Sequence, residues 1–209
     1  AFGGLAVQLI ERGEAGRMVT LTDGKPAELG VDQLKKELEV EKNFISGKDL
    51  VLNVHRKAKP EFVSLYLEEL VALGANELSI STETRDGYPK QVKFAPGSAV
   101  QKTPPCTLVG AITDDFGTAI WRVEGGTARK RQRGMGGPDL TITGDTILSL
   151  AKTCTESDLF VVHAAPTVEW GLIYDLAASG MILEKAGLKR AALPAERPTP
   201  GRPVDLSRK

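Results

Sequence analysis

Hydrophobic residues in the first 82 positions switch between helical and extended spacing. Residues 49–55 place Leu50, Leu52 and Val54 on one side, which is typical of a strand, whereas residues 60–73 follow the helical period. The pattern predicts five elements in β-α-β-α-β order: a strand at 18–22, a helix at 31–41, a strand at 49–55, a helix at 60–73 and a strand at 77–82.

The second half repeats this order after a stretch without periodicity. Residues 83–106 are rich in Gly and Pro, which indicates a linker or an extended edge segment. The elements predicted beyond it are a strand at 118–123, a Gly- and Arg-rich loop at 124–138, a helix at 145–154, a strand at 158–163, a helix at 168–186 and a strand at 188–193. From Pro194 onward the chain has prolines and no apolar period, so an extended or disordered tail is expected.

The two halves also share residues at matching positions. The strand at 49–55 resembles the strand at 158–163, and each is followed at the same distance by Glu, an aromatic residue and a Tyr. This spacing indicates two tandem copies of one unit. The predicted class is α+β, an α/β sandwich of two β-α-β-α-β units, each a small sheet with two helices on one face. The expected boundaries are a first domain at 1–84, a linker at 85–106, a second domain at 107–196 and a Pro-rich tail at 197–209.

The side chains expected to form the cores of the two copies are large and apolar. They are Leu50, Leu52, Val54, Phe62, Leu65, Leu70 and Ile80 in the first copy, and Leu159, Val161, Trp170, Ile173 and Leu183 in the second.

Composition narrows the function classes. The chain has 209 residues, of which 41% are hydrophobic, so there is enough apolar material for a globular core. Its 27 Lys and Arg balance 27 Asp and Glu, which argues against a nucleic-acid partner or an anionic membrane surface spread over the whole chain. No stretch approaches the roughly 18 consecutive apolar residues of a membrane span.

The two cysteines and two histidines limit the chemistry. Cys106 and Cys154 are too few for a thiolate zinc site, and no metal is expected. The pair is either a disulfide, if the compartment is oxidising, or two buried thiols, and the spacing does not decide between them. His55 and His163 each stand at the end of a predicted strand, where they either cap the strand end or belong to a small-molecule site between the repeats. No catalytic triad or carboxylate pair is present, so we expect a non-enzyme without a cofactor.

The loop at 125–137 carries four basic residues among glycines: Arg129, Lys130, Arg131 and Arg133. It lacks the Gly-Lys-Ser/Thr of a phosphate-binding loop. It is therefore either a flexible surface loop or a docking patch for an anionic partner, such as a cell-wall polymer, a lipid headgroup or an acidic protein face. These four residues are the partner-binding candidates.

Residues 48–82 resemble the periplasmic domain of the ExbD/TolR family. The shared features are a strand of the type Asp-Leu-Val-Leu-x-Val, a helix that begins at Pro60, a Leu-Gly-Ala turn and a last strand, Glu-Leu-Ser-Ile-Ser. Residues 19–25 look like that family's first strand and turn, and the second copy resembles the same domain more loosely.

The resemblance implies a periplasmic, non-enzymatic module of a proton-motive-force-driven envelope motor or transport system. Such a module is anchored in the inner membrane beside an ExbB/TolQ-like membrane subunit, and it transmits force or contacts peptidoglycan and other envelope partners. The family's N-terminal membrane helix is missing from this sequence, so its proton-carrying Asp is assigned to no residue here. The sequence is then either a periplasmic fragment or a divergent soluble relative.

Tandem copies suggest that one chain forms internally the pairing that other members form as homodimers. Two other functions stay open: a soluble cell-wall- or protein-binding module unrelated to proton motors, and a small-molecule enzyme or sensor that uses His55 and His163.

Overall fold

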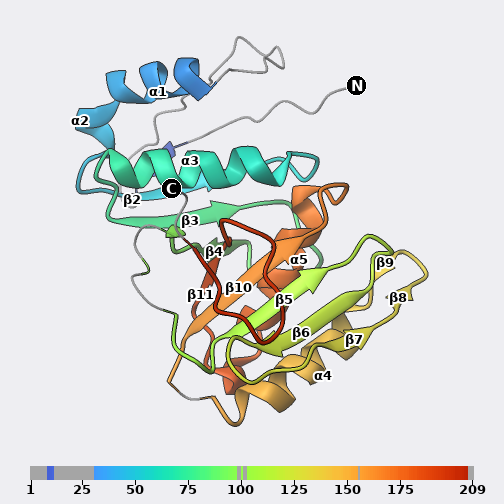
Figure 1. The fold of residues 1–209 in the computed structure, drawn as a ribbon. Helices are drawn as coiled ribbons and strands as arrows, with labels where there is room; N and C mark the ends of the chain where they lie inside the picture. Colours follow the sequence, from blue (N-terminus) through green and yellow to red (C-terminus); the bar gives the residue numbers. More distant parts are fainter. Residues whose placement is uncertain (1–8, 12–30, 98–99, 101–102, 155, 207–209) are drawn as a thin grey trace.

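The chain has an α+β fold with parallel and antiparallel strands (Figure 1). The computed structural model describes residues 9–11, 31–97, 100, 103–154 and 156–206. The strand predicted at 18–22, and the segment 19–25 that resembles the family's first strand and turn, lie outside these residues. No helix within the described ranges is long and apolar enough to cross a membrane.

The first half builds a four-stranded sheet. Its order is β1-β2-β3-β4, in which β2 and β3 are parallel and the two outer strands are antiparallel to their neighbours. Helix α3 connects β2 to β3, as the sequence pattern predicts. The elements are β1 (Leu9–Glu11), α1 (Val31–Val40), α2 (Lys42–Ile45), β2 (Asp49–Asn53), α3 (Pro60–Ala72), β3 (Glu77–Ser81) and β4 (Gln91–Lys93).

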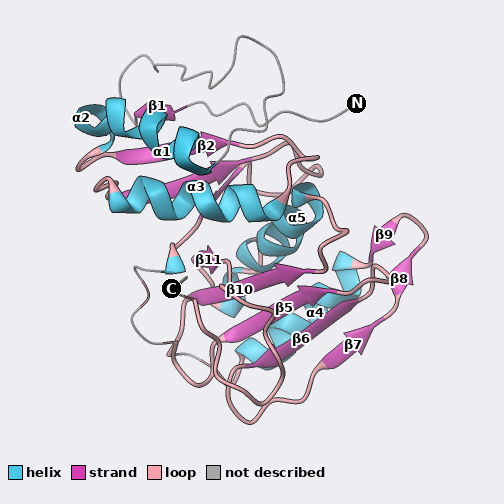
Figure 2. Ribbon diagram, turned by 45° about the horizontal axis from the view of Figure 1, so that its top comes forward, coloured by secondary structure: helices cyan, strands magenta, loops and turns pink. Residues whose placement is uncertain are grey.

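The second half builds a five-stranded sheet of order β11-β10-β5-β6-β7. Strands β11, β10 and β5 are parallel to one another, and β6 and β7 extend the sheet in antiparallel fashion. The strands are β5 (Leu108–Ile112), β6 (Thr118–Arg122), β7 (Arg129–Arg131), β10 (Leu159–Ala164) and β11 (Arg190–Ala192). A two-stranded hairpin, β8 (Arg133–Gly134) and β9 (Gly137–Pro138), projects beyond β7, and the helices are α4 (Leu140–Ala151), α5 (Trp170–Met181) and the 3-10 turn η2 (Glu184–Ala186) (Figure 2).

Several elements differ from those that the sequence predicts. The segment predicted as a linker contains β4, and the unassigned residues after it form β5. The predicted loop at 124–138 contains three short strands. Helix α4 begins earlier than expected because the Asp139 carboxylate caps it, accepting from the amides of Thr141 and Ile142 at 3.1 and 3.2 Å. The tail packs as far as Leu206, which is buried.

The two sheets meet at one strand crossing. The amide of Phe94 donates to Leu78 in the first sheet at 2.9 Å, and the amide of Ala95 donates to Ala191 in the second at 2.8 Å. Phe94 lies opposite Ala191 in a parallel bridge. The chain that leaves β4 therefore passes from one sheet to the other.

The helical side of both sheets shares one hydrophobic core. It includes Leu50 and Ile80 of the first half together with Phe160 and Trp170 of the second, all at most 1% exposed. A smaller cluster on the opposite face of the second sheet surrounds Trp121 and is covered in part by the C-terminal segment through Leu206. The two halves are thus packed as one body, and each contains a parallel β-α-β unit, β2-α3-β3 in the first and β10-α5-β11 in the second.

Candidate functional site

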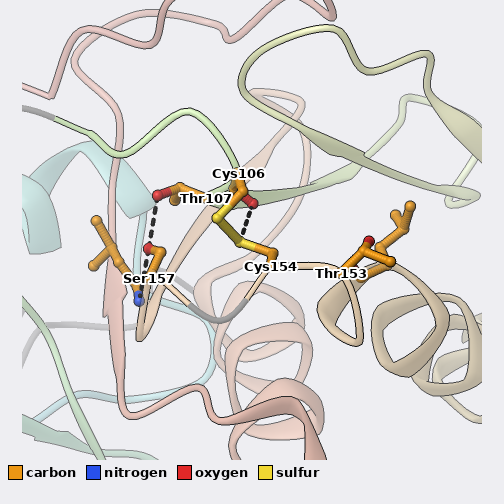
Figure 3. Close-up of a disulfide and its surroundings, with 7 residues drawn as sticks. Cys106, Thr107, Thr153, Cys154 and Ser157 are labelled. Carbon is orange, nitrogen blue, oxygen red and sulfur yellow. Dashed lines mark hydrogen bonds between the residues drawn. A yellow bond between two sulfur atoms is a disulfide. The ribbon is translucent and has the colours of Figure 1, made fainter.

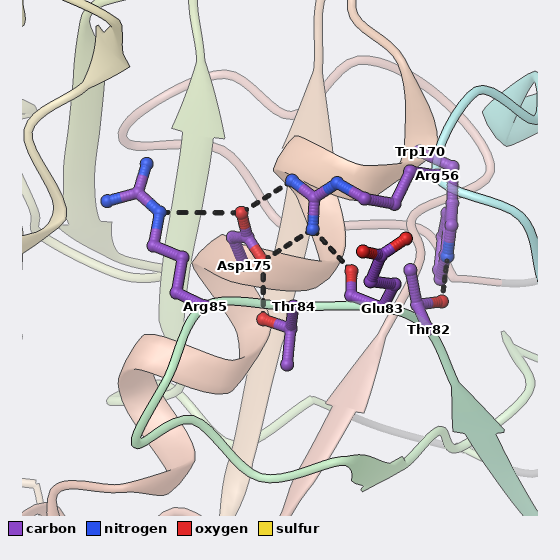
Figure 4. Close-up of polar contacts among 7 residues, drawn as sticks. All are labelled: Arg56, Thr82, Glu83, Thr84, Arg85, Trp170 and Asp175. Atoms are coloured by element: carbon purple, nitrogen blue, oxygen red, sulfur yellow. Dashed lines mark hydrogen bonds and ion pairs between the residues drawn. The ribbon is translucent and has the colours of Figure 1, made fainter.

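A buried carboxylate lies at the contact between the two halves of the chain. The side chain of Asp175, on α5, is completely buried. Two guanidinium nitrogens of Arg56 donate to its two carboxylate oxygens, at 3.2 and 2.8 Å (Figure 4). The Thr84 hydroxyl donates to the same carboxylate at 2.6 Å, and Nε of Arg85 lies 3.6 Å away. Asp175 is therefore held as a paired anion between segments from the first half and a helix of the second.

Backbone contacts bring Arg56 to this position. Arg56 follows β2, and its carbonyl accepts from the amide of Gly171 at 2.7 Å, while the amide of Trp170 donates to Ala58 at 3.0 Å. A β-carbon at position 171 would stand 2.9 Å from the Arg56 side chain. Glycine is thus needed there because the arginine lies directly against the first turn of α5. The Arg56 guanidinium also donates to the carbonyl of Glu83.

Aromatic side chains complete the contact. The indole nitrogen of Trp170 donates to the Thr82 hydroxyl at 2.8 Å, and the Tyr174 hydroxyl donates to the carbonyl of Pro89 at 3.0 Å (Figure 4 shows the Trp170 contact). Burial raises the pKa of Tyr174, and the Asp175 carboxylate raises it further. Burial also raises the pKa of Tyr88. Both phenols therefore stay neutral at ordinary pH; Tyr174 serves as a hydrogen-bond donor, and Tyr88 packs against the core.

The electrostatics favour a permanent pair. The hydrogen bond to Asp175 raises the pKa of Arg56 above its already high ordinary value, although partial burial opposes this. Both carboxylate oxygens of Asp175 accept from Arg56, Oδ1 also accepts from the Thr84 hydroxyl, and Oδ2 lies within ion-pair distance of Arg85. These contacts fix the orientation of α5 relative to the first half of the chain.

The two histidines have different surroundings. His55 is exposed, and its Nδ1 accepts from the amide of Lys57 at 3.2 Å, which is the contact expected of a strand-end cap. His163 lies within β10 and is half-buried, and burial, assisted by Arg197, lowers its pKa to about 4. No hydrogen bond or ion pair joins His55 to His163 among the described residues, and no group of three or more metal-binding side chains occurs within those same ranges.

The two cysteines are joined by a disulfide in the second half. Cys106 precedes β5 and Cys154 follows α4, with an S–S distance of 2.13 Å and a Cα–Cα distance of 5.2 Å (Figure 3). Beside it, the hydroxyls of Thr107 and Ser157 share a buried hydrogen bond of 2.7 Å. The disulfide therefore links the start of the central strand, β5, to the end of helix α4.

The basic residues at 129–133 lie at the outer edge of the second sheet. Arg129, Lys130 and Arg131 form β7 and are exposed, and Arg133 begins β8. Arg129 donates to the Ser149 hydroxyl and Arg131 to the Thr146 hydroxyl, both at 3.1 Å and both on α4. The segment is thus an ordered strand in place of a loop.

The pairing of Arg56 with Asp175 does not emerge from the sequence analysis. The available signal is a lone acid within the otherwise apolar run of α5, which calls for a buried cation as partner. The sequence does not identify that cation, because Arg56 lies 119 residues away in the other half of the chain.

Comparisons with known proteins add no assignment. No protein-family model matches the chain, and no curated protein and no solved structure is similar enough to count as a match.

Proposed function

We propose that the chain is a non-enzymatic periplasmic module of a proton-motive-force-driven envelope motor or transport system, of the ExbD/TolR kind. In this role it transmits force or anchors the complex to the cell wall or to envelope partners. Its partners are an ExbB/TolQ-like membrane subunit, reached through a membrane segment outside the present sequence, and peptidoglycan.

The observation that supports this proposal most is the packing of two β-α-β units around one core. In the family that residues 48–82 resemble, such domains work in pairs, and here Arg56 and Asp175 tie one copy to the other within a single chain. A buried charge pair resists separation, because either charge left alone in the interior is costly. An internal pair of this kind suits a module that carries load.

The disulfide supports the proposed location in the periplasm. Disulfides persist in oxidising environments such as the bacterial periplasm and are rare in the cytosol. Cys106 and Cys154 are placed to remain joined there.

The test is affinity purification of the full-length protein from native membranes. The proposal expects a multi-span membrane subunit to co-purify, and it expects a protonophore to change the set of cross-linked partners. It also expects both cysteines to resist alkylation unless a reductant is added. Recovery in the cytosolic fraction with free thiols, or the absence of any membrane subunit, would refute it.

Light scattering tests the internal pairing separately. A monomer is expected, since each copy already covers the surface through which the other would form a dimer. A tight dimer would contradict the idea that one chain replaces the usual homodimer.

A further inference from the structure

The outer edge of the second sheet is built to accept another strand. Strand β7 is the last of its sheet, and within the described residues no strand pairs with its outer side (Figure 2). Strand β1, at the far end of the first sheet, has no comparable run of charge.

The register decides which backbone groups point outward. The amide of Val123 donates to Thr107 and that of Thr113 to Gly117, at 2.9 and 3.0 Å, so the odd-numbered residues of β6 face β5. Hydrogen-bonding direction alternates along an antiparallel strand, so Thr118 and Ile120 face β7. They stand opposite Arg131 and Arg129. The amide and carbonyl of Lys130 therefore point away from the sheet, where a new strand would bind.

All the charged side chains of this edge are positive. Arg129, Lys130, Arg131 and Arg133 are all exposed, and no carboxylate of the described residues lies within ion-pair distance of them. The arginines of β7 donate only to neutral hydroxyls on α4, so each keeps further N–H groups available. The whole chain is neutral, so this edge is a local excess of positive charge.

The arrangement of the cations favours a peptide strand over a membrane. Arg129 and Arg131 lie on the α4 face of the sheet, whereas Lys130, opposite Ala119, lies on the other face. A planar array of headgroups cannot meet both faces at once. The side chains of an added strand project to both faces alternately, so they can meet all three cations.

We propose that β7 binds an extended acidic segment of a partner protein, which joins the sheet as a further strand. The outward amide and carbonyl of Lys130 pair with its backbone, and the cations of β7 pair with its carboxylates. This interaction uses a surface remote from the contact between the copies. The inference goes beyond the proposed function and can hold or fail without it.

The test is an NMR titration of the purified protein with the acetylated, amidated peptide Thr-Glu-Glu-Glu-Thr, whose three successive carboxylates project alternately to both faces of an added strand. Saturable shifts are expected at the amides of β7, together with slower hydrogen exchange of the Lys130 amide. The same peptide with N-methylated central amides keeps its charge but cannot pair with a strand, so it should bind at least about tenfold more weakly.

Matched variants separate the backbone and charge contributions. Lys130→Pro removes the outward amide together with the lysine charge, a backbone change that edge strands tolerate, and it should abolish strand binding without lowering the melting temperature much. Lys130→Gln removes the charge but keeps the amide, so it should weaken binding only about threefold or less. Arg129→Gln with Arg131→Gln should weaken binding about threefold to tenfold, because two exposed ion pairs are lost. Lys185→Gln with Lys189→Gln is the control that removes the same charge elsewhere and should leave binding unchanged.

Three results would overturn the proposal. They are the absence of saturable binding up to millimolar peptide, equal binding of the N-methylated peptide, and binding of phosphatidylglycerol vesicles through β7 while the peptide does not bind. The last result would assign the edge to a membrane.

Discussion

Removing Arg56 should destabilise the protein far more than removing an arginine of similar geometry at the surface. In Arg56→Ala, the completely buried Asp175 loses both of its closest charged contacts. Breaking a buried pair from one side costs about 3–5 kcal/mol, and the partial exposure of Arg56 places the expectation near the lower end, about 3 kcal/mol. For a chain of this size that corresponds to a fall in melting temperature of roughly 6–12 °C.

The chain provides a matched control in Arg190 and Asp158. This pair is also two-pronged, with distances of 3.2 and 2.8 Å, but its side chains are 47% and 39% exposed. Arg190→Ala should therefore cost only about 0–1 kcal/mol. The measurement is urea unfolding of both variants at neutral pH, followed by circular dichroism.

A double-mutant cycle completes this test. Arg56→Ala combined with Asp175→Asn leaves no unpaired buried charge, so it should cost about 2 kcal/mol less than the sum of the two single changes. The reasoning would be refuted if Arg56→Ala were no more costly than Arg190→Ala, or if the two single changes simply added.

Three further predictions concern the disulfide, a glycine and a histidine. Reduction of Cys106–Cys154, which closes a loop with a sequence separation of 48, should lower the free energy of unfolding by about 4 kcal/mol; melting with and without reductant measures this, and the double Cys→Ser variant should not respond to reductant. Gly171→Ala, whose β-carbon would stand 2.9 Å from Arg56, should cost about 1–3 kcal/mol, whereas Gly144→Ala, whose nearest neighbour would be 3.7 Å away, should be neutral or stabilising by up to about 1 kcal/mol; a stable Gly171→Ala protein would contradict the close approach. The folded-state pKa of His163 is about 4, below its ordinary value of 6.5, so the unfolded state binds more protons between these values and stability should fall as pH falls through that window. Urea unfolding at pH 7 and pH 5 should show a loss of about 2 kcal/mol that is absent from His163→Gln, and an identical loss in both proteins would show that other groups are responsible.

The apolar pattern and the turn residues predicted several of the central elements. Strands β2, β3 and β10 and helix α3 fall within a residue or two of the predicted ranges, and most of the expected core is buried. Phe62, Leu65 and Leu183 are the exceptions, being only half-buried.

The missed elements lack a readable period. Strand β5, Leu-Val-Gly-Ala-Ile, is a short continuous apolar run in the middle of its sheet, and such runs show no alternation. Strand β7 contains no apolar residue, and it is fixed instead by pairing with β6 and by hydroxyls on α4. The first turn of α4 contains Thr, Ile and Gly, which are weak helix formers, so only its cap and its packing reveal it.

The candidate sites also differ in whether the sequence alone predicts them. A cluster of basic residues and a pair of cysteines are visible in the letters, because composition alone singles them out. The contact of Arg56 with Asp175 depends on how two segments distant in the sequence pack in the folded protein, and a single sequence does not reveal that packing.

The crossing from β4 to β11 has a consequence for the order of folding. Ala95 and Ala191 come from opposite halves of the chain, and so do Arg56 and Asp175. Contacts between such distant residues form late, because a long loop must close before any of them contributes. The disulfide, in contrast, closes within the second half and does not require the first. Refolding should therefore be slow and limited by docking of the halves, with oxidation of the cysteines able to precede it.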